Sequence, residues 1–352
     1  MRTLSRRDWF GSAAIALGAA RAGDPEQEKN AARQGLDIHV HLFGTGDAGS
    51  GCRLSKKITH GIQFQILARQ LGLDSRAKTR DESYVLALVE HAEKSSLAKL
   101  ALVGQDAVYD AAGKPDWERT NFYVPADYVL KTCRAHADRF IPCPGLNPDR
   151  RDAVAELDRL HGEKVRAFKI HPPTTGCDLA DPKHAKFFAR AAALKFTILV
   201  HTGHEHSAPV LDKALADPAR LERALDAGCV VVACHAGTGW PTDRPDQVPA
   251  FLKLAKRHAN FYGDTSVLGS MFRARDFYRL LDDPAARERL VHGSDFPFPV
   301  YPRQFSDRIG RKQAGDLARE PSLIEMDYKL KAALGIGAAS AARGLKLLSA
   351  PT

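Results

Sequence analysis

LDIHVHL, residues 36–42, is the stretch of this sequence that decides the fold. It reads as a β-strand, and a strand repeats every two residues, so His39 and His41 project from the same face. An H-x-H pair at the end of a strand therefore presents two imidazoles to one point in space. Nitrogen ligands of this kind suit a borderline divalent cation such as zinc, with manganese, nickel or iron as alternatives.

Four further strand-like runs also end in residues that bind metals or charged groups. They are VRAFKIH with Lys169 and His171, FTILVH with His201, VVVACH with His235, and RLVHGSD with Asp295. If these strands lie parallel around a barrel, their carboxyl ends converge on the point that His39 and His41 face. The sequence therefore predicts a catalytic metal site at that end of the barrel.

Strand-like runs and amphipathic helices alternate from residue 36 onward, which is typical of a parallel sheet with crossover helices. The predicted strands are 36–42, 98–104, 138–144, 165–171, 196–201, 229–235, 260–264 and 289–294. Eight such strands close an α/β barrel of the (β/α)8 TIM type, and one domain over 36–350 accounts for them. The predicted helices are 83–95, 125–137, 150–161, 182–194, 247–258 and 273–282, followed by helical stretches near 302–318 and 320–348 that would pack outside or cap the barrel. The Gly-rich loop 43–57 is expected to form part of the pocket wall or a lid.

The N-terminal residues 1–22 differ in kind from the rest of the chain. Arg6 and Arg7 precede a Gly/Ala-rich apolar run, and Ala20-Arg21-Ala22 resembles a cleavage site. The pattern S-R-R-x-x-F resembles the twin-arginine export signal, whose bacterial pathway carries folded proteins. We therefore expect a signal peptide over 1–22, a linker over 23–35 and a periplasmic location.

The composition is that of an ordinary globular protein, with 44% hydrophobic and 26% charged residues. No segment approaches the roughly 18–20 apolar residues that a membrane-spanning helix needs. The formal net charge is +9, but lysines and arginines are scattered and no nucleic-acid motif appears, so we expect a small-molecule substrate and not nucleic acid. Of the six cysteines, Cys52 and Cys177 both fall in loops after the predicted metal-bearing strands, so either a disulfide or two unrelated thiols remains open.

Five motifs occur in a fixed order over residues 36–298: DIHVHLFG, FKIHPP, ILVHTG, VACHAG and HGSDFPF. Together they resemble the amidohydrolase superfamily, and within it the amidohydrolase-2 branch of metal-dependent TIM-barrel hydrolases and non-oxidative decarboxylases. The resemblance implies that the ligands of the principal metal are His39, His41, His201 and Asp295. A zinc ion is expected there, with one ion favoured and two as the alternative.

The resemblance also implies roles for single residues. Asp295 would take the proton of a metal-activated water and hand it to the leaving group. His235 would hydrogen-bond that water or polarise the substrate carbonyl, or would bind a second metal. Lys169 would be carbamylated and bridge two ions in a binuclear site, or would present a cation to the substrate in a mononuclear one. His171 shares its face and is a further candidate for a second metal or for substrate.

The predicted function is that of a metal-dependent hydrolase acting on an amide, lactone, ester or C–C-bonded carbonyl. One alternative uses the same ligands, namely a non-oxidative decarboxylase of a carboxylated aromatic or unsaturated acid. A second alternative is a metal- or ligand-binding protein without turnover. Asp264 is expected to orient a ligand histidine through a hydrogen bond, and a homodimer is frequent in the branch that the chain resembles.

Overall fold

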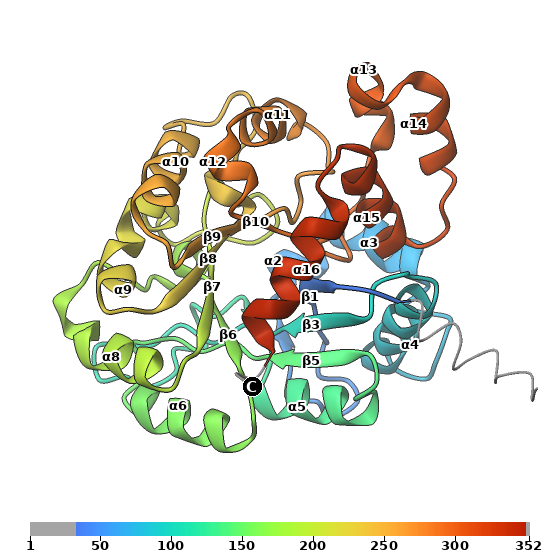
Figure 1. The fold of residues 1–352 in the computed structure, drawn as a ribbon. Coiled ribbons are helices and arrows are strands. Elements are labelled where there is room, and N and C mark those ends of the chain that lie inside the picture. The colour runs from blue at the N-terminus through green and yellow to red at the C-terminus, as the bar shows by residue number, and fades with distance from the viewer. Residues whose placement is uncertain (1–32, 350–352) are drawn as a thin grey trace, which may run out of the picture. The chain divides into compact units, whose positions relative to one another are not determined.

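The computed structural model describes residues 33–349. Within them, eight parallel strands form a ring, as the sequence predicts (Figure 1). They are β1 (Leu36–His41), β3 (Lys99–Val103), β5 (Phe140–Cys143), β6 (Ala167–Ile170), β7 (Thr197–His201), β8 (Val230–Cys234), β9 (Phe261–Asp264) and β10 (Leu290–Val291). The predicted signal peptide lies outside the described residues, so export through it stays a prediction.

The ring consists of two sheets, β1-β3-β5 and β10-β9-β8-β7-β6, that join at both seams. At one seam Val40 pairs with Phe296, and at the other Gly145 pairs with Lys169, both in parallel. The backbone N–H of Leu146 donates to the Lys169 carbonyl at 2.9 Å across the second seam. The fold is therefore a closed TIM barrel, as predicted.

Helices surround the ring and follow the strands in sequence (Figure 1). The longer ones are α4 (Arg80–Glu93), α5 (Ala126–Ala135), α6 (Ala153–Gly162), α8 (Ala185–Ala193), α10 (Val248–Arg257), α11 (Ala274–Asp282), α15 (Leu323–Ala333) and α16 (Gly337–Leu348). Local chemistry fixes their ends: at α4 the Thr79 hydroxyl accepts a hydrogen bond from the Glu82 N–H at 3.2 Å. The predicted stretch 320–348 is two helices and not one, because Gly335 takes a left-handed φ of 84° and ends the first.

Short elements lie mostly on the loops that follow the strands. The short helical ones are α2 (Lys56–Thr59), α7 (Pro172–Thr175), α9 (Glu222–Asp226), α12 (Pro284–Arg287), α13 (Ser306–Ile309) and α14 (Arg311–Leu317), with single 3-10 turns η1 (Pro182–His184), η2 (Lys213–Ala216), η3 (Pro218–Leu221), η4 (His235–Gly237) and η5 (Pro302–Phe305). The longer helix α3 (Ile62–Leu71) lies between α2 and α4 in the sequence. A two-stranded antiparallel ribbon, β2 (Arg53–Leu54) with β4 (Phe122–Tyr123), was not predicted. None of the helices in the described residues is long and apolar enough to cross a membrane.

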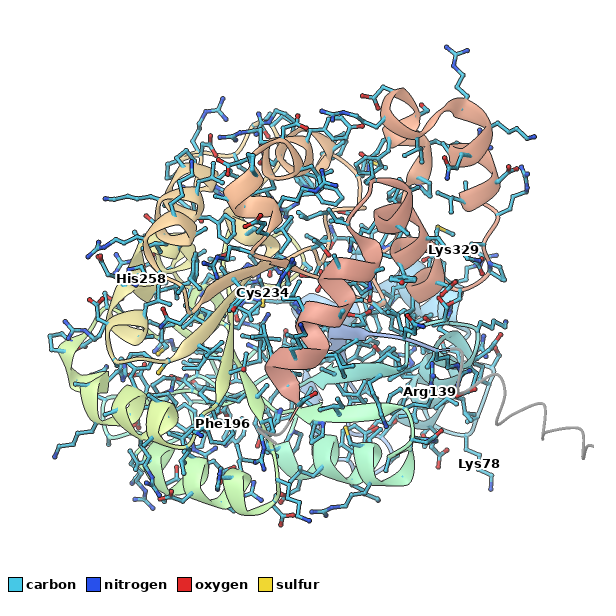
Figure 2. All side chains as sticks on the ribbon, viewed as in Figure 1. Lys78, Arg139, Phe196, Cys234, His258 and Lys329 are labelled. Carbon is cyan, nitrogen blue, oxygen red and sulfur yellow. The ribbon has the colours of Figure 1, made fainter. Side chains whose placement is uncertain are left out.

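Apolar side chains fill both faces of the strands. The interior cluster includes Leu199, Val232 and Cys234, and Figure 2 shows Cys234 within the ring of strands. Helix α16 crosses the ring (Figure 1), and Leu348 packs into the same cluster, so the last helix caps the amino-terminal end of the barrel. The six cysteines are all free, so Cys52 and Cys177 do not form a disulfide.

Strand β1 contains an irregularity that the alternating pattern does not reveal. Asp37 pairs with Leu100 and Val40 pairs with Leu102, so two residues of β1 lie opposite the single residue Ala101. A bulge of this kind changes which face the following side chains occupy. Leu36 and Ile38 face the interior cluster by ordinary alternation, and the shift turns the following His39 and His41 to the interior as well, at the carboxyl end of the barrel.

The second seam generates a prediction about stability. A Cβ added at Gly145 would lie 2.3 Å from the Asp106 nitrogen and 2.5 Å from the Gln105 carbonyl carbon, and backbone atoms cannot rotate away. We expect Gly145→Ala to lower the free energy of unfolding by about 1–3 kcal/mol, because overpacking forces the seam apart. Thermal unfolding would show this as a lower Tm.

The matched control is Gly162→Ala at the end of α6, where the new Cβ would meet no atom within 4 Å. Its Tm should stay the same or rise, since alanine favours a helix over glycine by about 1 kcal/mol. Equal Tm values for the two variants would contradict the role of the seam.

Candidate metal centre

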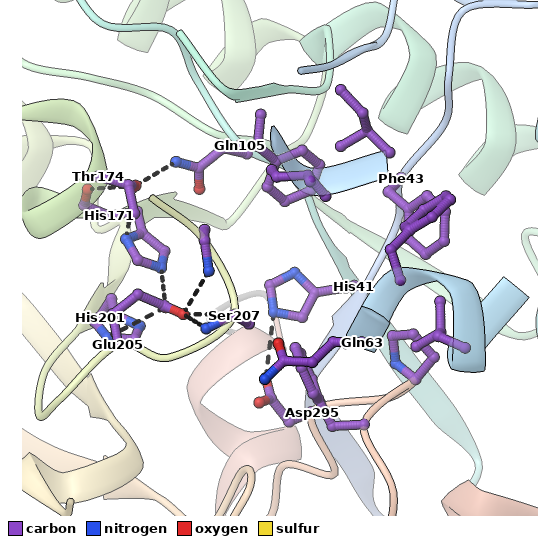
Figure 3. A pocket seen from close by; sticks show the side chains of 18 of the residues that line it. His41, Phe43, Gln63, Gln105, His171, Thr174, His201, Glu205, Ser207 and Asp295 are labelled. Carbon is purple, nitrogen blue, oxygen red and sulfur yellow. Dashed lines mark hydrogen bonds and ion pairs between the residues drawn. The ribbon is translucent and has the colours of Figure 1, made fainter. Parts of the chain in front are cut away.

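The first group of ligand atoms lies where β1 ends and β10 continues into its loop. The Nε2 atoms of His39 and His41 are 3.3 Å apart, and each lies 3.2 Å from Oδ1 of Asp295. Figure 3 shows His41 and Asp295 pointing toward each other. Tetrahedral ligands bound to zinc at 2.0–2.2 Å are about 3.3–3.6 Å apart, so these three atoms are within about 0.1 Å of the spacing of a coordination shell. Asp295 Oδ1 is buried and has no hydrogen-bond partner in residues 33–349, which also fits a cation.

The backbone at Asp295 is held in an unusual conformation. Its φ is 65°, in the left-handed region that residues other than glycine rarely adopt. The Asp295 N–H donates to the His39 carbonyl at 2.9 Å, and the N–H groups of His39 and Ser294 both donate to Asp37 Oδ1 at 3.0 Å. Asp37, which the sequence analysis did not single out, thus fixes the strand ends that carry two ligands. Strain of this kind is common at functional sites, where the surrounding structure maintains it.

Asp264, at the end of β9, orients the ligand His39. His39 Nδ1 lies 2.8 Å from Asp264 Oδ2, which confirms the predicted hydrogen bond. With the proton on Nδ1, the Nε2 lone pair faces Asp295 and His41. Burial, together with the nearby Lys169 charge, lowers the pKa of His39 to about 3, so its imidazole is neutral and able to bind a metal at neutral pH. Burial acts to raise the pKa of Asp264, but His39 holds it well below its usual range.

A second group of ligand atoms lies at the carboxyl ends of β6 and β7 and in the loop after β7. Glu205 Oε2 lies 3.1 Å from His171 Nε2 and 3.7 Å from His201 Nε2, and the two imidazoles stack with centroids 4.0 Å apart. Figure 3 shows both rings and Ser207 directed at Glu205. The ligand atoms of His171, His201 and Glu205 lie within 4.8 Å of one another, and could also hold a cation. His201, the predicted fourth ligand of the first group, lies in this neighbouring group, and its role as a ligand of the principal metal stays a prediction.

His235 connects the two groups. Its Nδ1 lies 2.9 Å from the Ser266 hydroxyl, and its Nε2 lies 3.2 Å from His201 Nδ1. Its ring centroid is 5.4 Å from that of His39. Like Asp295, it has a left-handed backbone, with φ 63°. Burial lowers the pKa of His235, so the imidazole is neutral at neutral pH.

Lys169 lies beneath the first group and not in the open cavity. Its side chain is 1% exposed, with Nζ 3.3 Å from His39 Nε2 and 2.9 Å from Cys234 Sγ. A carbamate at this nitrogen would be next to a predicted ligand, whereas an unmodified ammonium would place its charge under the metal centre. The two predicted roles of Lys169 stay predictions.

Two adjoining cavities open onto the groups. Asp295, His201, His235 and Glu205 line both. The outer wall of the first cavity is apolar and consists of Phe43, Leu54, Ile58, Phe64, Leu67, Phe122 and Phe298. Phe43 and Leu54 belong to the loop 43–57, so the prediction that this loop forms part of the pocket wall is confirmed.

Arg273 lines the second cavity and was missed by the sequence analysis. It is 5% exposed, and its guanidinium donates to the backbone carbonyls of Thr238 at 2.6 Å and His204 at 3.1 Å. Within residues 33–349, no carboxylate lies within 4.0 Å of it, and its buried Nε has no hydrogen-bond partner. Burial lowers the pKa of Arg273, although Glu205 opposes the shift. A buried guanidinium stays charged, so it favours an anion in the cavity.

Glu205 and Arg273 were both missed by the sequence analysis, and only Glu205 carries a sequence signal that could have revealed it. Glu205 follows His201 by four residues in the loop after β7, so an acidic residue close to a strand end could have been noted. Arg273 lies in the run MFRARDF, two residues before Arg275. The sequence pattern does not distinguish the buried arginine from the exposed one.

Comparisons with known proteins agree with the fold. An uncharacterised TIM-barrel protein from Bordetella bronchiseptica superposes with a TM-score of 0.60 at 16% identity, covering 90% of this chain and 99% of that one. IDCase from Metarhizium anisopliae superposes with a TM-score of 0.52 at 16% identity, covering 91% of this chain and 99% of that one. The 2,6-dihydroxybenzoate decarboxylase from Rhizobium gives 0.50 at 16% identity over 90% and 100%.

No curated protein matches the sequence. At these identities, the three structures establish the TIM-barrel fold alone. The sequence itself matches the family model described as amidohydrolase, of the amidohydrolase-2 type, over residues 36–340, which is most of the chain. The chain therefore belongs to the amidohydrolase-2 family.

Proposed function

We propose that the chain is a metal-dependent, non-oxidative decarboxylase of a small carboxylated aromatic or unsaturated acid. The observation that carries this proposal is Arg273, a buried guanidinium without a carboxylate partner in the described residues, in a cavity that also contains Asp295 and His235. A substrate carboxylate would supply the missing negative charge through charge-assisted hydrogen bonds.

The first cavity supports an apolar, flat substrate body. Phe43, Phe64 and Phe122 line its wall, whereas its ionisable groups lie at the inner end with His41 and Asp295. Aromatic side chains favour offset or edge-on packing against a flat ring, by roughly 0.5–1.5 kcal/mol beyond simple burial. A molecule with one charged end and one aromatic end therefore suits the cavity better than a sugar or a peptide.

The first group supports a divalent cation, and we propose zinc. His39, His41 and Asp295 supply two imidazoles and one carboxylate, which is a donor set that zinc favours and that manganese also accepts. When bound there, the cation would polarise a carboxylate or carbonyl oxygen as a Lewis acid, and would lower the pKa of water. One ion is the simpler arrangement, with His201 turning toward it, and the His171–Glu205 side could hold a second.

Decarboxylation requires one proton to be delivered to carbon. The bond between the carboxyl carbon and its neighbour breaks, carbon dioxide leaves, and the electron pair stays on that neighbour until a proton arrives. His235 lines both cavities, and its Nε2 faces His201 Nδ1 at 3.2 Å, so a proton can pass between the two imidazoles. The 2,6-dihydroxybenzoate decarboxylase with the same fold supports this reaction.

Hydrolysis is the second candidate, and Asp295 favours it. Burial acts to raise the pKa of Asp295, but His39, His235 and His41 hold it below its usual range, so the carboxylate is ionised at neutral pH. An ionised carboxylate beside a cation can accept the proton of an attacking water. The two reactions differ in their products, because only decarboxylation releases carbon dioxide.

Metal content tests the ligand assignment. We expect Asp295→Ala to contain about one divalent ion per chain less than the wild type, because removal of its charge leaves two neutral ligands. Inductively coupled plasma mass spectrometry on protein purified without chelators would measure this. His161→Ala is the control, since His161 is an exposed residue of α6 that lines neither cavity and belongs to no candidate metal group of the described residues. Equal metal content in Asp295→Ala and wild type, with both folded by circular dichroism, would refute the assignment.

Carbon dioxide release tests the reaction. We expect labelled carbon dioxide from carboxyl-13C aromatic acids, including 2,6-dihydroxybenzoate, detected by membrane-inlet mass spectrometry. Products that have gained water from a panel of lactones, esters and amides, without carbon dioxide release from any acid, would favour hydrolysis instead. Metal-replete protein without either activity would favour the binding-protein alternative.

The role of Arg273 is tested by a charge-removing variant of similar length. We expect Arg273→Met to raise KM for the carboxylated substrate roughly 10- to 100-fold, since a charge-assisted hydrogen bond contributes about 1.5–3 kcal/mol. Arg275→Met is the matched control, because Arg275 is half-exposed and pairs with Asp276 outside both cavities. An unchanged KM in Arg273→Met would show that the carboxylate binds elsewhere.

A further inference from the structure

A third group of metal-binding side chains lies outside the two cavities. Asp149 comes from the loop after β5, Cys177 follows α7, and His184 ends η1 immediately before α8. None of the three lines either cavity of the metal centre. The group therefore ties the β5 loop to the segment that connects β6 with α8.

The ligand atoms have the spacing of a tetrahedral site. Cys177 Sγ lies 3.8 Å from His184 Nε2, and that nitrogen lies 3.4 Å from Asp149 Oδ1. With zinc–sulfur bonds of about 2.3 Å and zinc–nitrogen or zinc–oxygen bonds of about 2.1 Å, the edges of a tetrahedron measure about 3.6 Å and 3.4 Å. The three atoms could thus bind one ion after shifts of a few tenths of an ångström.

The geometry differs from that of a nucleophilic triad. In such a triad the histidine faces the nucleophile with one nitrogen and the carboxylate with the other. Here Cys177 and Asp149 both lie against the same nitrogen, Nε2 of His184. Three donors around a single point are the arrangement that a cation requires.

Burial prepares the side chains for metal binding. Cys177 is fully buried and His184 is 3% exposed. Burial lowers the pKa of His184, so its imidazole is neutral, as a ligand must be. Burial and the Asp149 carboxylate raise the pKa of Cys177, so the thiol keeps its proton until a metal ion displaces it.

A lysine ammonium already lies beside the carboxylate of this group. Lys183 Nζ is 2.7 Å from Asp149 Oδ1, while the Lys183 side chain as a whole is 57% exposed. A positive charge therefore neutralises Asp149, and the flexible side chain can move into solvent when another cation binds. Lys183 would compete with the metal ion.

We propose that Asp149, Cys177 and His184 bind a divalent cation of the zinc type, with water as the fourth ligand. The site is structural and independent of the proposed decarboxylation. It would fix the segment 171–184, which begins with His171 of the metal centre and continues through α7. Its occupancy would thus limit how far His171 can move.

Cobalt titration of the reduced, chelator-treated protein tests the proposal. A thiolate bound to Co²⁺ gives a charge-transfer band in the near ultraviolet, which histidine and carboxylate ligands do not produce. We expect the band in the wild type, its loss in Cys177→Ser and its retention in Cys229→Ser, because Cys229 is buried but belongs to no candidate metal group of the described residues. Cys234→Ser should also keep the band, although Cys234 lies near His39 and Asp264 of the first centre.

A second variant distinguishes loss of a metal ligand from misfolding, which could also remove the band in Cys177→Ser. We expect Lys183→Ala to bind cobalt at least several-fold more tightly than the wild type, because the competing ammonium is gone while the exposed position tolerates alanine. A wild type without the band, a band that persists in Cys177→Ser, or a band lost in Cys234→Ser would each overturn the proposal. So would unchanged cobalt affinity in Lys183→Ala.

Discussion

The buried carboxylate of Asp264 is the constraint on which the rest of the centre depends. It accepts hydrogen bonds from His39 Nδ1 at 2.8 Å and from the His235 N–H at 2.8 Å, and so joins β1, β8 and β9. A carboxylate without solvent is costly unless every oxygen is bonded, and here both oxygens are. Asp264 therefore determines the tautomer of His39, the backbone turn at His235 and the spacing of β1, β8 and β9.

Much of the fold could be predicted because its signals are local. Each barrel strand is a short apolar run with a turn after it, and all eight appear where expected. The bulge at Ile38 and His39 was not predictable, since it arises from pairing with Ala101, far away in the sequence. The break between α15 and α16 was marked by Gly335, but a glycine in a helical pattern does not by itself reveal a left-handed backbone.

In the site, too, residues with a local sequence signal could be predicted, whereas residues that matter through long-range contacts could not. His39, His41 and Asp295 could be predicted because strand ends in a barrel converge, and they do lie together. His201 was expected with them, but its ring stacks on His171 and its Nε2 lies 3.7 Å from Glu205 Oε2. Asp37 and Arg273 were not predicted because their importance comes from their contacts and not from their spacing in the sequence. Asp37 accepts hydrogen bonds from two backbone N–H groups. Arg273 is buried without a carboxylate partner within the described residues.

The position of α16 has a consequence for how the protein matures. Strand β1 and the loop after β10 meet at Val40 and Phe296, and α16 then covers the barrel interior with Leu348. During synthesis the first strand leaves the ribosome early but can pair with this neighbour only after residue 296 has emerged. While the strands between β1 and β10 are being made, His39 and His41 therefore lack Asp295 as a third ligand. The three ligands therefore come together only after β10 and the loop that follows it have been made, and one ion cannot be bound by all three before that point.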